Sequence, residues 1–142
     1  GGWVATSPLE VIAMNRYQGL HTLVLLDLDP TGEGVGGQVP MQPQDAVNAM
    51  MAMSEKLSET IQEMQQETPL EQIRVEACKQ ICLDTANLMV VLCSDMGTKE
   101  QAITYAKLSE LSNVKSGRLH SLVIPANLSD VENSALHRWA KE

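Results

Sequence analysis

The sequence predicts an α/β fold, a sandwich of about four mixed strands with flanking helices, in a single domain over residues 1–142. Short apolar runs bounded by turn residues are typical of buried strands. Segments with helical apolar spacing, several of them opened by Ser or Thr, surround these runs and predict helices. A chain of this length can bury a full hydrophobic core. The predicted strands include Leu20–Asp29, Asn87–Cys93 and Leu119–Ile124.

The composition narrows the classes of function. With 10 Lys+Arg against 18 Asp+Glu the net charge is -8, which argues against a nucleic-acid partner. No run approaches the roughly 18 apolar residues of a membrane span, and we expect no secretory signal, since a charged first region and an apolar region after it are missing. Three Cys without a signal predict reduced thiols and a cytoplasmic location. Because the chain starts at Gly1 rather than Met, we expect it to be a piece of a longer protein.

The first part of the chain predicts a helix that leads into a strand. Ser7-Pro8-Leu9-Glu10 reads as a capping box and predicts a helix over residues 8–18, which Gly19 would end. The apolar run Leu20–Asp29 follows directly. A continuous run of this kind is typical of a strand buried on both faces and central in its sheet.

Two carboxylates and a glycine-rich stretch follow that run. Asp27 and Asp29 point to opposite faces because side chains alternate along a strand, so they cannot act as a carboxylate pair. The stretch Asp29–Gly37 lacks the glycine spacing of phosphate-binding loops and predicts a surface loop.

Two helices are predicted in the middle of the chain. Gln42–Asp45 opens the first, with Pro at its first position, and the helix runs to about Gln66. Its methionines suit core filling, or else an adaptable partner-binding groove. A capping box at Thr68–Glu71 opens the second, which runs to about Leu83. Its predicted apolar face is Leu70, Ile73, Ala77 and Ile81, and Cys78 and Cys82 on it lack the further ligands of a zinc site.

The last third alternates strand and helix patterns. Strand Asn87–Cys93 ends in a polar turn, and strand Leu119–Ile124 is stopped by Pro125. Between them, Gln101–Leu111 fits either a helix or a strand, and the pattern alone slightly favours helix. A capping box at Ser129–Glu132 predicts a terminal helix. The residues expected to line one face of that helix are Val131, Leu136 and Trp139.

The residues alone predict no catalytic and no metal site. No G-x-S-x-G elbow is present, and the histidines are scattered. We expect each histidine to be a satisfied structural residue, and the chain to complete a pocket made with another domain. The three histidines are His21, His120 and His137.

Two blocks together carry a resemblance to a known family. The first is Gly19-Leu20-His21-Thr22-Leu23 with Leu26-Asp27, and the second is Leu119–Pro125, continuing through Leu128, Val131 and Glu132. A weaker third block runs from Val90 to Gly97. In these blocks the chain resembles the second domain of the diphthine synthase family, which has the tetrapyrrole methylase fold. The resemblance implies two α/β domains that hold S-adenosyl-L-methionine in the cleft between them, and a homodimer.

The resemblance also implies a reaction. The family transfers a methyl group from S-adenosyl-L-methionine to a modified histidine of translation elongation factor 2, in diphthamide biosynthesis, with S-adenosyl-L-homocysteine as product. Such a transfer depends on alignment more than on an acid or base from the protein. The chain would be the C-terminal half of this methyltransferase without its N-terminal cofactor domain, and inactive alone. The alternatives are a domain of a precorrin-type tetrapyrrole methyltransferase and a non-catalytic dimerisation domain.

Carried over to this sequence, the cofactor-binding residues are Leu26, Met96 and His120. Leu26 and Met96 would present backbone groups. Asp95 is the alternative to Met96, because the turn Cys93–Gly97 is one residue longer than in the family. The resemblance also makes Gln101–Leu111 a strand, which we adopt over the pattern, so that Thr98…Gln101 becomes a false cap.

Overall fold

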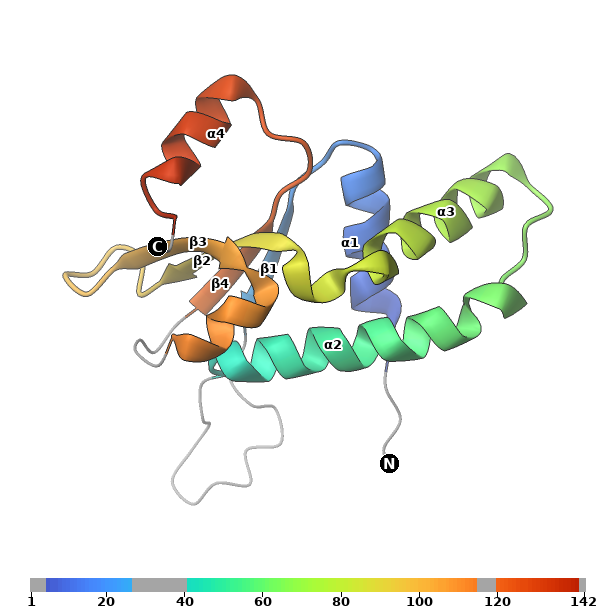
Figure 1. The fold of residues 1–142 in the computed structure, drawn as a ribbon, viewed down its shortest axis with the longest axis horizontal. Helices are drawn as coiled ribbons and strands as arrows, with labels where there is room; N and C mark the ends of the chain where they lie inside the picture. The colour runs from blue at the N-terminus through green and yellow to red at the C-terminus, as the bar shows by residue number, and fades with distance from the viewer. Residues whose placement is uncertain (1–4, 27–40, 115–119, 141–142) are drawn as a thin grey trace, which may run out of the picture.

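The structure, a computed structural model, describes residues 5–26, 41–114 and 120–140. Figure 1 shows a small sheet with most of the helices on one side and the last helix of the chain on the other. The helices are α1 (Ser7–Tyr17), α2 (Pro43–Thr60), α3 (Pro69–Leu83) and α4 (Asp130–His137), and the strands are β1 (Thr22–Leu26), β2 (Met89–Ser94), β3 (Ala102–Lys107) and β4 (His120–Ile124). The α/β class, with four strands and flanking helices, is confirmed.

The prediction of mixed strand directions is wrong. The sheet has the order β1-β4-β2-β3, and all three pairings are antiparallel. β1 and β2 run in the same direction, and α2 and α3 lie between them in the chain, which is the arrangement that usually gives parallel neighbours. Here β4 inserts between β1 and β2 and pairs with both (Figure 1).

The apolar run that we expect to be central and doubly buried forms an edge strand instead. Among the described strands β1 pairs only with β4, and its alternate side chains Leu23 and Leu25 are 62% and 70% exposed. Only the inner face of this strand, with Leu26, contributes to the core. Asp27, Asp29 and the predicted loop to Gly37 lie outside the described residues.

Local sequence signals place most helix ends correctly. Thr68 and Ser129 cap α3 and α4, each accepting a backbone N–H three residues later. Gly19 lies at φ 81° just after α1, as a C-terminal glycine should. The capping box at Ser7 is wrong: α1 starts at Ser7 with Thr6 at its N-cap, and the Thr6 hydroxyl donates to the Glu10 carboxylate.

The core lies between the inner face of the sheet and α1, α2 and α3. Its fully buried members include Leu9, Leu57, Val75, Cys78, Val90, Leu92, Leu108, Leu111, Leu122 and Ile124. The predicted faces of two helices are partly wrong. In α3, Leu70 is 65% exposed and Ile73 is also exposed, while Ala77 and Ile81 are buried. No residue of α4 is buried: Val131 is 80% exposed and Leu136 only partly buried, and Trp139 lies beyond the end of the helix.

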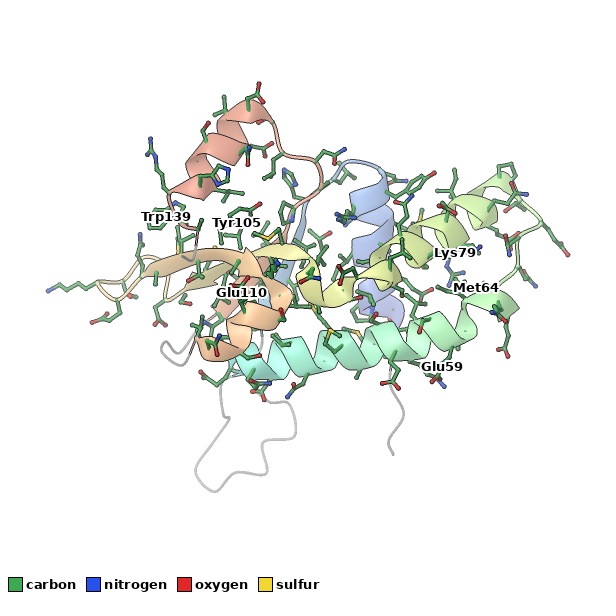
Figure 2. The ribbon with its side chains drawn as sticks, in the orientation of Figure 1. Glu59, Met64, Lys79, Tyr105, Glu110 and Trp139 are labelled. Carbon is green, nitrogen blue, oxygen red and sulfur yellow. The ribbon has the colours of Figure 1, made fainter. Side chains whose placement is uncertain are left out.

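The ambiguous segment contains β3, which then turns into a 3₁₀ helix, Leu108–Asn113. The strand interpretation is confirmed over the helical one, and no helix follows Thr98. The chain end returns to the outer edge of this strand: the Tyr105 N–H donates to the Trp139 carbonyl at 2.8 Å. Figure 2 shows these two side chains in the same part of the molecule, where the chain leaves α4.

The three cysteines are free. Burial raises the pKa of the Cys78 thiol to about 11, and the pKa values of the other two are raised for the same reason. Thiols held protonated in this way are poor nucleophiles and poor metal ligands. None of the helices in the described part of the chain combines the length and the apolar character that crossing a bilayer requires.

Candidate functional site

Three strand termini meet at one end of the sheet. Because β1 and β2 run in one direction and β4 in the other, the ends of β1 and β2 lie beside the start of β4. Leu26 and Ser94, the last residues of β1 and β2, are both register partners of His120, the first residue of β4. Directly paired residues point to the same face, so these three side chains share the inner face. All three are buried.

The centre of this sheet end is a serine–histidine pair. The Ser94 hydroxyl lies 2.8 Å from His120 Nδ1, and the two residues are 6% and 4% exposed. The second ring nitrogen, Nε2, is buried and has no hydrogen-bond partner among the residues that the structure describes. The expectation that His120 is a satisfied structural residue therefore holds for only one of its nitrogens. A buried polar atom without a partner is uncommon and calls for an explanation.

The turn after β2 has a defined shape. Asp95 lies at φ 49° and Gly97 at φ 84°, both in the left-handed region. The Thr98 hydroxyl donates to the Asp95 carbonyl at 2.7 Å, and the Gly97 N–H donates to the Gln101 side chain at 3.1 Å. Met96 is held between them with half of its surface exposed.

The sequence-predicted cofactor residues are thus partly brought together. Leu26 and His120 are direct neighbours, whereas Met96 lies two residues beyond the partner of His120 in β2. Ser94 is the residue that sequence reasoning missed. The only signal for it would have been the pairing of β2 with β4, which joins residues 26 positions apart.

Two cavities in the described part of the chain lie elsewhere. One, of about 280 Å³, lies between α4 and the outer face of the sheet, with Val91, Val123 and Leu136 in its walls. The other, of about 300 Å³, includes Met89 and Pro125, at the end of the sheet opposite His120. Neither cavity is lined by Leu26, Met96 or His120. No group of three His, Cys, Asp or Glu side chains within the described ranges could hold a metal ion.

A second histidine joins the two sequence blocks to each other. The Ala126 N–H donates to His21 Nδ1 at 2.9 Å, so the hydrogen of the neutral ring is on Nε2, which lies 2.7 Å from the Glu132 carboxylate. The other oxygen of Glu132 accepts the Ser129 N–H at 2.9 Å. One carboxylate therefore caps α4 and fastens that helix to the start of β1.

This arrangement shifts the pKa of the Glu132 carboxyl. The Ser129 backbone hydrogen bond, followed by that of His21, lowers the pKa of Glu132 to about 2. A lowered carboxyl pKa stabilises the fold above the ordinary value of 4.5, and the contribution is lost as the pH falls toward 2. We expect His21→Ala to raise this pKa without restoring it fully, since the Ser129 bonds remain.

Carboxyl carbon NMR shifts followed against pH measure this effect. Glu71 is the internal control, because it caps α3 through Thr68 in the same way but has no histidine partner. Its titration should not change in His21→Ala. An unchanged Glu132 titration in that variant would show that the histidine does not hold the carboxylate.

The sequence is similar to curated proteins named as diphthine synthases. No family model matches the chain. The chain is 31% identical to a diphthine methyl ester synthase of Yarrowia lipolytica over 146 aligned residues, covering 99% of this chain and 43% of the relative. It is 25% identical to a diphthine synthase of Pyrobaculum islandicum, covering 99% of this chain and 45% of that protein. The chain thus spans less than half the length of the curated relatives it matches.

Solved structures agree on the fold. A conserved hypothetical protein from Aeropyrum pernix superposes with a TM-score of 0.68 at 26% identity, over 96% of this chain and 40% of that one. A protein assigned as a diphthine synthase from Entamoeba histolytica gives 0.64 at 22% identity, over 99% and 48%. In sequence and in fold, the chain is similar to the C-terminal part of diphthine synthases.

Proposed function

We propose that the chain is the C-terminal half of a two-domain S-adenosyl-L-methionine-dependent methyltransferase of the diphthine synthase type. Its substrate in the whole protein would be the modified histidine of translation elongation factor 2, in diphthamide biosynthesis. The names of the relatives favour this over a precorrin enzyme. The free thiols agree with work in the cytoplasm.

The unpartnered Nε2 of His120 is the observation that carries the proposal. It is a buried polar atom at the sheet end where the family resemblance places cofactor contacts, and a polar ligand edge would satisfy it. Bound S-adenosyl-L-methionine would supply an activated methyl group on its sulfonium. The chain's own part is to bind and orient: His120 through its ring nitrogen, Leu26 through backbone groups at the end of β1, and Met96 through backbone groups in the turn after β2.

Calorimetry with S-adenosyl-L-homocysteine on the chain as it stands tests this proposal. We expect weak, saturable binding that His120→Ala removes. We also expect no methyl transfer to the modified elongation factor, because the alignment of substrate and cofactor needs both walls of the cleft. Absence of binding would contradict the cofactor proposal, and a measurable transfer rate would contradict the inactivity of the chain alone.

The homodimer that the resemblance implies has a candidate surface. Leu23 and Leu25 project from edge strand β1, and no charged residue lies within the strand. An uncharged, apolar edge is a template for another strand, and natural proteins usually cover or charge such edges. We place a second copy of the chain against this strand.

Sedimentation velocity of Leu25→Glu tests the dimer. Two like charges brought together across an interface oppose association, so we expect the dissociation constant to rise at least about tenfold. Leu70→Glu is the matched control, since Leu70 is 65% exposed on α3, away from β1. A wild-type monomer at all concentrations, or equal effects of both variants, would contradict the assignment.

A further inference from the structure

We infer that Ser94 is a positioning residue: its hydroxyl fixes the ring of His120 so that Nε2 is presented as a hydrogen-bond acceptor to the bound cofactor. This inference rests on the proposed function and extends it to a residue outside the predicted site. Ser94 would not itself touch the cofactor. It would act through the ring that it holds.

The pairing geometry supports this role. Ser94 and His120 are register partners on β2 and β4, and the 2.8 Å contact between hydroxyl and Nδ1 is buried. The adjacent pair on the same face, Leu92 and Leu122, is wholly apolar and fully buried. A buried polar atom without a hydrogen-bond partner lowers the stability of the fold. A pair that served the fold alone would have no need of such an atom.

The burial of Nε2 selects between the two tautomers of a neutral ring. If Nδ1 carries the hydrogen, it donates to the Ser94 oxygen and Nε2 keeps only a lone pair. If Nε2 carries the hydrogen, the ring buries an N–H group without a partner. Buried N–H groups left unpaired are rarer in proteins than under-used acceptors, so the first tautomer is favoured.

The tautomer defines the chemistry of the ligand group. A lone pair at Nε2 accepts a hydrogen bond, so the matching group must be a donor. The cofactor offers such donors in the exocyclic amino group of its adenine and in its ribose hydroxyls. Without the serine, the ring would rotate between orientations and share its hydrogen between the two nitrogens, and the acceptor would no longer be held in place.

Two measurements on the 142-residue chain test the inference. Long-range nitrogen–proton NMR reports the tautomer of His120, and calorimetry reports the affinity for S-adenosyl-L-homocysteine. We expect the Nδ1–H form in the wild type and a mixed form in Ser94→Ala, with affinity lowered about three- to tenfold, the value of one hydrogen bond. Ser94→Thr keeps a hydroxyl and should restore both. Ser58→Ala, at an exposed hydroxyl on α2, is the control and should change neither.

The outcomes separate this inference from the proposed function. If the wild type binds and Ser94→Ala binds equally well, the positioning role is overturned and the proposed function stands. If the wild type does not bind, the cofactor proposal is overturned and the ligand half of the inference with it. In that case the NMR spectrum still decides whether the serine sets the state of the ring: an unchanged tautomer in Ser94→Ala would overturn this half too.

Discussion

Replacement of Leu122 by alanine is expected to lower the free energy of unfolding by about 3–5 kcal/mol. Leu122 is fully buried on the inner face of β4, and its register partners are Val24 on β1 and Leu92 on β2. The truncation would remove contacts to both neighbouring strands and leave a cavity at the centre of the sheet. For a domain of ordinary stability this is a large fraction of the total.

Urea denaturation followed by circular dichroism measures the loss. Leu83→Ala is the matched control, because it makes the same truncation at a residue that is 83% exposed and lies outside the proposed dimer surface. We expect that change to cost no more than about 0.5 kcal/mol. Equal losses in the two variants would contradict the assignment of the loss to the burial of Leu122 at the centre of the sheet.

The elements that depend on local chemistry could be predicted from the sequence. Capping at Thr68 and Ser129 needs only a hydroxyl and a carboxylate three residues apart, so the start of each helix is encoded within one turn. Gly19 ends α1 for an equally local reason. The strand at β3 is different. Its pattern also fits a helix, and only the family resemblance favoured the strand.

What depends on long-range placement could not be predicted. A continuous apolar run such as that of β1 fits a central strand, but it says nothing about whether a neighbour covers its outer face. Leu23 and Leu25 alternate with the inward-facing residues of β1, which is an edge strand, and they are exposed on its outer face. In α3, Leu70 fits the helical period but lies in the first turn, beyond the reach of the core.

The candidate site also has residues that could be predicted from the sequence and one that could not. The family resemblance predicted Leu26 and His120 as cofactor-binding residues, and the register of β1 with β4 makes them neighbours. Ser94 had no such signal, because the end of β2 reads as the beginning of a polar turn. Only the pairing of β2 with β4 turns this residue inward against the histidine.

Replacement of both members of the buried pair, Ser94→Ala with His120→Leu, is expected to abolish cofactor binding while leaving the fold intact. The two changes remove the hydroxyl, the ring and the unsatisfied Nε2 together. When both partners of a buried hydrogen bond become apolar, the effect on stability is close to neutral or favourable. We therefore expect the free energy of unfolding to stay the same or to rise by up to about 1 kcal/mol.

The single variant His120→Leu is the informative comparison. It leaves the Ser94 hydroxyl buried without its partner, which costs about 1–3 kcal/mol. Urea denaturation of both variants, with calorimetry against S-adenosyl-L-homocysteine, therefore separates stability from binding. A double variant less stable than the single one would mean that the pair stabilises the fold. A double variant that is stable but cannot bind would mean that the unsatisfied histidine at this end of the sheet serves ligand binding and not folding. Such departures from a fully satisfied interior are expected at functional sites.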